Sequence, residues 1–160
     1  MRAEMIFALL LGLGVAFVVW LLTAQRIQAH DQRYVYVAEI VSVYDGDTAT
    51  VDIDVGFDVW LRDQDLRFYC VNTPEIRGSE RNEGIPVRDT VREWLPVGST
   101  VTLETVQDRT GKFGRWLALI TPEGWDETVN ARLLREGLAE IEAYSPTQVA
   151  ACNERLGILQ

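Results

Sequence analysis

The 160-residue sequence predicts a mainly β domain of the α+β class. We expect a five-stranded Greek-key barrel of the OB kind with two to three helices, preceded by an N-terminal hydrophobic helix. Three observations predict this fold. Short segments rich in β-branched and aromatic residues recur between turn residues. Two amphipathic helical patterns follow the third and the fifth of these segments. The length suits a single domain, and five short strands with an intervening helix suit a small closed barrel.

The five expected strands share apolar β-forming residues bounded by turn signals. The second strand shows the clearest alternation, with Ala49, Val51 and Ile53 on one face until Gly56 interrupts the run. Asp45-Gly46 is a turn signal between the first two strands. The expected strands are 34–43, the run that begins at Thr48, 66–71, 100–106 and 113–121.

Two amphipathic helices and a possible third are predicted. The first begins near Pro86, where a missing N–H has no cost, and its apolar face carries Val87, Val91, Trp94 and Leu95. The second covers "ETVNARLLREGLAE" (127–140), with Val129, Leu133 and Leu134 inward and Gly137 near its end. A short helix is expected from Pro146.

Residues 5–22 carry no charge and are apolar almost throughout. A helix of this length spans about 27 Å, close to the thickness of a bilayer core. We favour a membrane anchor over a cleaved signal peptide, because signal peptides have shorter apolar regions and an A-x-A-like site. A buried helix is a third alternative. The expected organisation is an anchor or signal segment (1–24), a linker (25–33) and a folded domain (34–160).

The chain is acidic, with 15 basic and 24 acidic residues and a net charge of −9. It therefore does not resemble proteins that coat nucleic acid by bulk charge, and a polyanionic substrate would need a local basic site. Two cysteines, Cys70 and Cys152, are too few for a disulfide framework or a zinc site. We favour two buried free thiols, with a disulfide as the alternative if the domain is exported.

Polar residues gather in two motifs beside the predicted strands. Asp47 begins the second strand in "VYDGDTATVDI" (43–53), and its carboxylate can hold a hard cation such as Ca²⁺. Arg67 and Arg115 would repel each other near one carboxylate unless an anion lies between them, and a phosphodiester fits. Glu75 follows the turn residue Pro74 and could orient or deprotonate a water molecule.

Four segments, in this order, resemble the staphylococcal (thermonuclease-like) nuclease family. They are "VYDGDTATVDI" (43–53), "RFYCVNTPEIRG" (67–78), "GKFGRWLALI" (111–120) and "VNARLLREGLAEIEAY" (129–144). Each segment alone is a weak signal. Their order, spacing and chemistry agree, and the resemblance covers about residues 35–144.

The resemblance implies roles for individual residues. Asp47, Asn72 and the carbonyl of Thr73 match the calcium ligands of the family. Arg67 and Arg115 match the two phosphate-binding arginines of the family, and Glu75 matches its catalytic glutamate. Lys112, Phe113 and Tyr144 match residues beside its nucleotide pocket. The family pattern has aspartate where this chain has Asn72. An amide oxygen can still bind calcium, but the site loses one negative charge and should bind the ion more weakly.

The sequence therefore predicts a calcium-dependent nuclease acting on DNA and RNA, which by resemblance leaves 5′-hydroxyl and 3′-phosphate ends. We expect a monomer anchored by residues 5–22 with an extracytoplasmic C-terminal domain, or a protein secreted after signal cleavage. One alternative is a non-catalytic OB module that binds nucleic acid or a protein partner. Another is an adaptor whose function lies in the membrane segment.

Overall fold

A computed structural model of the protein describes residues 34–106, 116–143 and 145–157. The chain divides into two units, Met1–Arg33 and Tyr34–Gln160, and all described residues belong to the second. The N-terminal hydrophobic helix and the linker predicted from the sequence lie outside the described residues. Within the described part of the chain, no helix has the length and apolar character that crossing a bilayer requires.

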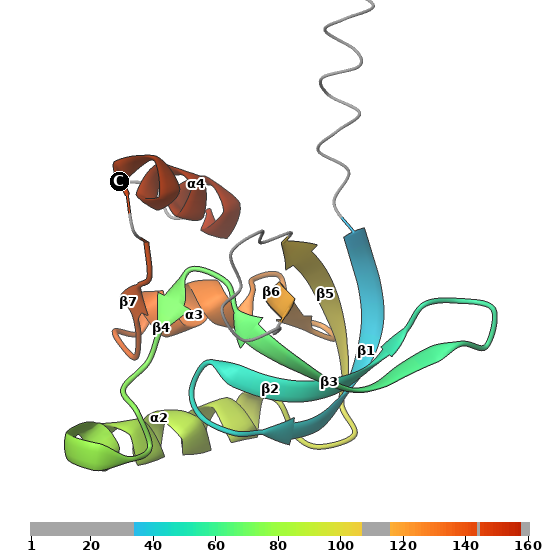
Figure 1. The fold of residues 1–160 in the computed structure, drawn as a ribbon, viewed down its shortest axis with the longest axis horizontal. Coiled ribbons are helices and arrows are strands. Elements are labelled where there is room, and N and C mark those ends of the chain that lie inside the picture. Colours follow the sequence, from blue (N-terminus) through green and yellow to red (C-terminus); the bar gives the residue numbers. More distant parts are fainter. Residues whose placement is uncertain (1–33, 107–115, 144, 158–160) are drawn as a thin grey trace, which may run out of the picture. The chain divides into compact units, whose positions relative to one another are not determined.

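A closed five-stranded barrel forms the centre of the domain (Figure 1). Its strands follow the order β1-β2-β3-β6-β5 and close onto β1, which confirms a mainly β barrel consistent with an OB-like fold. The barrel is mixed, since β3 and β6 run parallel whereas its other neighbouring strands run antiparallel. The strands are β1 (Tyr34–Val43), β2 (Thr48–Asp54), β3 (Trp60–Phe68), β5 (Thr100–Val106) and β6 (Trp116–Pro122).

The barrel interior follows the alternation read from the sequence. Ala49, Val51 and Ile53 of β2 are all buried, and their neighbours Thr50 and Asp52 are partly exposed. Because side chains alternate across a strand, one face of β2 can fill the core while the other remains polar. Fully buried residues from the other strands and from the helices complete this core; among them are Ile40, Leu66, Phe68, Leu103, Ile120 and Leu133.

The third strand begins earlier than predicted, at Trp60 rather than residue 66. It forms a long hairpin with β2, which extends from the barrel in Figure 1. Polar contacts stabilise this hairpin: Arg62 donates to Asp52 at 2.5 Å, and Thr50 donates to Asp65 at 2.9 Å. The strand has no apolar period over residues 60–65 because both faces of the hairpin meet solvent, so hydrophobic alternation could not reveal it.

The chain leaves the barrel after β3 through a tight turn. Cys70 adopts a left-handed conformation with φ of 65°, and β4 (Val71–Asn72) then pairs with β7 (Glu140–Ile141) in a separate two-stranded sheet. The predicted third strand, 66–71, is therefore divided by this turn. Residue 72, a predicted metal ligand, therefore belongs to the small sheet and not to the barrel.

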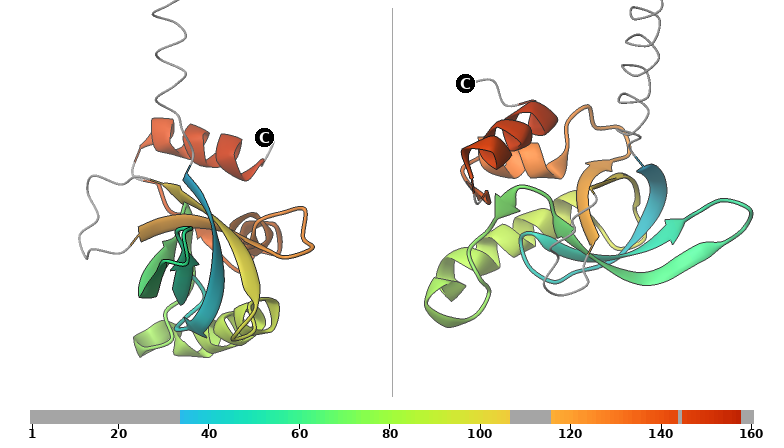
Figure 2. Two further views of the ribbon diagram at one scale, coloured as in Figure 1. Left: turned by 90° about the vertical axis from the view of Figure 1, so that its right-hand side faces the viewer. Right: turned by 45° about the horizontal axis from the view of Figure 1, so that its top comes forward.

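Among the described residues, three α-helices lie around the barrel, namely α2 (Arg81–Trp94), α3 (Val129–Arg135) and α4 (Pro146–Leu156). The views in Figure 2 show α2 and α4 on opposite sides of the barrel. The predicted start of the first helix at Pro86 was wrong, because a 3₁₀ turn (Gly78–Glu80) leads directly into α2. Pro86 therefore lies inside the helix, where it leaves the carbonyl of Asn82 without its usual partner.

Cys70 and Cys152 form a disulfide with a Cα–Cα distance of 5.7 Å. The preference for free thiols was therefore wrong, and the open alternative is the one observed. Around the disulfide, Leu119 and Leu156 form a small apolar cluster distinct from the barrel core. The disulfide thus attaches α4 to the turn that follows β3.

Candidate active site

Asp47 is the centre of the candidate site. It follows the turn after β1 and is 1% exposed. Its Oδ2 accepts hydrogen bonds from the backbone N–H of Thr73 at 2.7 Å and from the Thr73 hydroxyl at 2.9 Å. The other oxygen, Oδ1, accepts from the Thr48 hydroxyl at 3.3 Å and from Arg67. Two predicted metal ligands, Asp47 and Thr73, are therefore in direct contact.

Arg67 lies near the end of β3, and its guanidinium contacts oxygens from three segments. Nη1 donates to Oδ1 of Asp47, in an ion pair whose two side chains are 15% and 2% exposed. Nη2 donates to Oδ1 of Asn72 at 2.9 Å and to Oε2 of Glu142 at 3.2 Å. The structure thus brings Arg67 together with the two predicted ligands that would bind through side-chain oxygens, Asp47 and Asn72. Glu142 is an additional carboxylate that the sequence analysis did not identify.

Gly46 allows the turn after β1 to approach Thr73. A Cβ at residue 46 would lie 2.6 Å from Oγ1 of Thr73 and 2.7 Å from Cγ1 of Val87, distances that real Cβ atoms do not show. The turn is closed by a hydrogen bond from the N–H of Tyr44 to the carbonyl of Thr48, at 2.9 Å. Glycine at this position therefore places Asp47 within reach of Thr73.

Burial raises the pKa of Asp47 from 3.8 to about 6. The positive charge of Arg67 and the hydrogen bonds from Thr73 oppose this effect, and the negative charge of Asp45 adds to it. Asp45 is itself buried, and its Oδ1 accepts from the N–H of Asp47 at 3.1 Å. Burial therefore outweighs the compensation that Arg67 and Thr73 give this carboxylate, and shifts of this kind are common at functional sites.

Glu75 combines a fixed backbone with an exposed side chain. Its N–H donates to Oε2 of Glu80 at 3.0 Å. A Cβ at Gly84 would lie 2.4 Å from the carbonyl oxygen of Glu75 and 2.5 Å from that of Pro74, so α2 packs closely against this turn. The carboxylate of Glu75 is therefore held on a defined backbone and is accessible to water.

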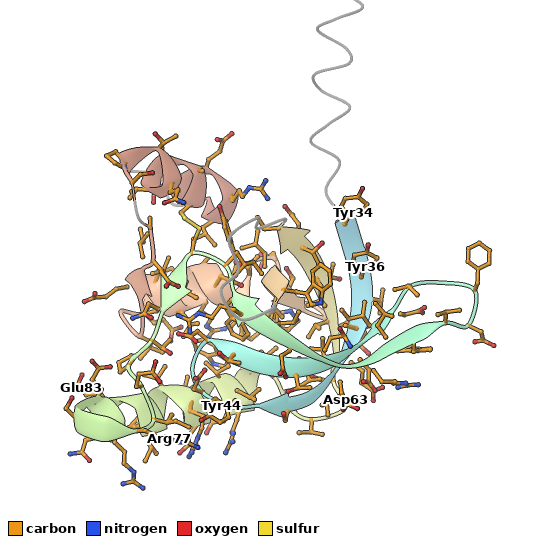
Figure 3. The ribbon with its side chains drawn as sticks, viewed as in Figure 1. Tyr34, Tyr36, Tyr44, Asp63, Arg77 and Glu83 are labelled. Atoms are coloured by element: carbon orange, nitrogen blue, oxygen red, sulfur yellow. A yellow bond between two sulfur atoms is a disulfide. The ribbon has the colours of Figure 1, made fainter. Side chains whose placement is uncertain are left out.

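An aromatic and a basic side chain flank these residues. The guanidinium of Arg77 lies 5.8 Å from the ring centroid of Tyr44, and Figure 3 shows the two side chains near each other. Tyr44 immediately precedes Asp45, and Arg77 follows Glu75 by two residues. Both side chains are exposed.

Four of the predicted site residues lie outside the described residues: Arg115, Lys112, Phe113 and Tyr144. Within the described part of the chain, no group of three or more His, Cys, Asp or Glu side chains is arranged to hold a metal ion. The predicted ligand set contains only one carboxylate, on Asp47, together with an amide oxygen and a carbonyl. Oxygen donors of this kind suit a hard cation such as calcium, although their total charge is low.

Asn130 is a structural residue that the sequence analysis did not identify. It is fully buried near the start of α3, where its Nδ2 donates to the carbonyls of Tyr69 and Ala118 and its Oδ1 accepts from the N–H of Ile120. It therefore connects α3 both to β6 and to the turn that leads to the site. An amide between the inward-facing Val129 and Leu133 was a visible signal, since a buried polar side chain needs partners.

No family model matches the chain, and no curated protein matches it. The resemblance to the staphylococcal nuclease family therefore rests on the four sequence motifs alone.

Proposed function

We propose that the protein is a calcium-dependent nuclease that hydrolyses phosphodiester bonds of DNA and RNA, on a Greek-key barrel of the OB type. One observation carries this proposal. The guanidinium of Arg67 contacts both Asp47 and Asn72, so the oxygens predicted to bind a cation already surround a positive charge. A solvated surface turn, the simplest alternative reading of the DGDT motif, would not require Asp47 to be buried.

Asp47, Oδ1 of Asn72 and the carbonyl of Thr73 would hold the calcium ion. When bound, the ion would act as a Lewis acid that withdraws charge from a phosphoryl oxygen. The single carboxylate in this set predicts weak affinity. Weak affinity suits an extracytoplasmic location, where calcium is plentiful.

Arg67 would change partners when substrate binds. At present its guanidinium neutralises Asp47. A cation at Asp47 would take over this role, and the guanidinium would become available to phosphate oxygens. A planar guanidinium binds two oxygens of a phosphate at once, and it stabilises the charge that develops on them during hydrolysis. Arg115 is proposed to bind the same phosphate from the segment 111–115.

Glu75 is proposed as the group that orients or deprotonates the attacking water. Its carboxylate is exposed, and its backbone is held by Glu80 and by the packing of Gly84. A general base needs such a defined position within hydrogen-bonding distance of the water.

The disulfide supports a location outside the cytoplasm. Disulfides persist in oxidising compartments and are rare in the cytosol. Together with the apolar segment 5–22, Cys70–Cys152 favours a membrane-anchored protein whose folded domain is extracytoplasmic. Secretion after cleavage of a signal peptide is the second form of this proposal.

A cleavage assay tests the proposed function. The purified full-length chain, kept in mild detergent, is incubated with single-stranded DNA or RNA in millimolar calcium or in chelator. We expect cleavage only with calcium. A Glu75→Gln preparation purified in parallel controls for contaminating nucleases. Calcium-dependent binding without cleavage would instead favour the non-catalytic OB module.

A further inference from the structure

Glu142 lies at the candidate site and within the motif segment 129–144, but the resemblance gave it no role. It follows β7 directly, and its Oε2 accepts from Nη2 of Arg67 at 3.2 Å. The same nitrogen donates to Oδ1 of Asn72 at 2.9 Å. The carboxylate of Glu142 and the amide oxygen of Asn72 are therefore neighbours on one guanidinium.

The backbone of Glu142 is held in place from two directions. Its N–H donates to the carbonyl of Cys70 at 3.0 Å, and β7 pairs with β4 so that Asn72 lies opposite Glu140. Cys70 is in turn bonded to Cys152. The side chain is 33% exposed, so its carboxylate meets both Arg67 and solvent.

The charges around Arg67 explain what this carboxylate could do. The nuclease-like pattern implies two acidic side chains at residues 47 and 72, but here residue 72 is a neutral amide. Asp47 and Glu142 are the carboxylates that contact Arg67 within the described part of the chain, on Nη1 and Nη2 respectively. The negative charge that is absent from residue 72 is thus present on an oxygen beside it.

We propose that Glu142 supplies the second negative charge of the calcium site. Asn72 then contributes a neutral oxygen, and Asp47 and Glu142 together balance the double charge of the ion. This inference rests on the proposed function for the place of the ion. It concerns ion binding, however, and can be tested without any cleavage. Affinity for calcium in proteins depends on the number of charged ligands, so the charge on Glu142 should be measurable as affinity.

Calcium binding to the full-length chain, measured by isothermal titration calorimetry, tests the proposal. Glu142→Gln keeps an oxygen that can accept from Arg67 but removes the charge, and it should weaken calcium binding by about tenfold or more, on the scale that ligand charge sets. Asn72→Asp should strengthen binding. The double variant Glu142→Gln/Asn72→Asp should return close to the wild-type affinity, since it moves the charge from one oxygen to its neighbour.

Glu123→Gln is the matched control. Residue 123 is exposed after β6, and its N–H bonds to the carbonyl of Thr100, away from the contacts of Arg67. The Glu123→Gln variant loses the same charge as Glu142→Gln, so it measures any effect of net charge alone on calcium affinity. Glu142→Ala provides the same test if the glutamine variant does not fold, as judged by circular dichroism.

Equal calcium affinity in Glu142→Gln and Glu123→Gln would overturn the proposal, because the charge of Glu142 would then have no effect of its own on ion binding. A wild-type chain that binds no calcium at millimolar concentration would overturn it too. Failure of the proposed nuclease activity looks different: calcium binds with the expected dependence on Glu142, yet neither DNA nor RNA is cleaved.

Discussion

A single oxygen of Asp47, Oδ2, accepts two hydrogen bonds from Thr73, one from the backbone and one from the hydroxyl, at 2.7 and 2.9 Å. These bonds connect the turn after β1 to the turn after β4. They favour the ionised carboxylate, whereas burial favours the protonated form, and burial has the larger effect on the pKa of Asp47. Protons and Arg67 therefore compete for one group, and the proposed calcium ion would compete with both.

The stability of the protein in chelator should depend on this pKa. Because the folded-state pKa of Asp47, about 6, lies above the ordinary 3.8, the native state binds more protons than the unfolded state between these values. The contribution of Asp47 to the free energy of unfolding should therefore fall as pH rises from about 4 to about 6. Urea unfolding at a series of pH values measures this, and Asp47→Asn should remove the dependence.

Asp52 provides an internal contrast. Hydrogen bonds from Arg62 and from the N–H of Asp63 lower the pKa of this carboxylate. Its contribution to stability is therefore present above the ordinary aspartate pKa and is lost only as pH falls below it. Asp52→Asn should therefore remove a pH dependence of stability that lies at more acidic pH than the one removed by Asp47→Asn. Identical pH ranges for both variants would contradict the assignment.

Calcium affinity should rise as pH increases through about 6. The proposed ion would bind the ionised carboxylate, so below this pH it would have to displace the proton from Asp47. Calorimetric titrations at pH 5 and pH 7.5 measure the calcium affinity. At pH 5, proton release on binding should make the observed binding enthalpy depend on the ionisation enthalpy of the buffer. An affinity independent of pH over this range would mean that Asp47 does not bind the ion.

Two glycine substitutions should separate ion binding from catalysis. A methyl group at Gly46 meets Thr73 and Val87, and one at Gly84 meets the backbone of Pro74 and Glu75. Such overpacking typically costs about 1–3 kcal/mol. Gly46→Ala should weaken calcium binding, whereas Gly84→Ala should mainly lower the cleavage rate by displacing Glu75. Calorimetry and cleavage assays on both variants, with stability from urea unfolding, make the comparison.

Removing the proposed catalytic groups should lower turnover strongly. Loss of a preorganised donor costs about 10²–10³ in kcat, and loss of a general base about 10²–10⁴. We therefore expect Arg67→Ala, Arg115→Ala and Glu75→Gln each to lower kcat at least about a hundredfold at saturating calcium. Arg67→Lys should recover little activity, because an ammonium cannot bind two oxygens as a guanidinium does.

Arg135 is the control for these substitutions. It lies exposed at the end of α3 and pairs with Glu127 at 2.7 Å, so Arg135→Ala should keep near-normal activity. Arg132 is less suitable, since its guanidinium lies 4.7 and 4.5 Å from the rings of Trp94 and Trp125 and its loss would disturb packing. An equal loss of activity in Arg135→Ala would point to a general defect.

The N-terminal segment can be tested by deletion. We expect the full chain to remain with membranes in carbonate, and deletion of residues 1–24 to release a folded, soluble domain. Fractionation followed by immunoblotting measures both. A soluble full-length product whose first residue lies near 25–30 would favour the signal peptide over the anchor.

The barrel could be predicted from the sequence because apolar alternation identifies its strands, as it does for Ala49, Val51 and Ile53 of β2. The sequence did not predict the hairpin that starts at Trp60, whose two faces both meet solvent, or the parallel pairing of β3 with β6, which depends on long-range packing. The start of α2 was placed too late because Pro86 is a common first helical residue, and the tight packing of Gly84 is invisible in the sequence.

Within the site, motif order was enough to associate Asp47 with Arg67 and residues 72 and 73. Motif order could not identify Glu142. The strand before it, β7, has only two residues and shows no periodicity, and only the pairing of β7 with β4 brings the Glu142 side chain to Arg67. The sequence offered the disulfide only as the alternative to free thiols, since cysteine spacing carries no information on distance in space. Buried cysteines are common without one.

The disulfide between Cys70 and Cys152 has a consequence for the order of events during biosynthesis. The cysteines are 82 residues apart, and two of the five barrel strands (β5 and β6), α2, α3 and the β4–β7 pair are encoded after the first of them. At ordinary translation rates, roughly 4–16 s separate the synthesis of the two residues. The thiol of Cys70 therefore has no Cys152 to pair with until the rest of the domain has been synthesised. The disulfide can form only after other contacts have started to bring the two cysteines together. During that interval the chain is exposed to mispairing with a second nascent copy, so its yield should depend on the thiol-exchange catalysts of the compartment into which it emerges.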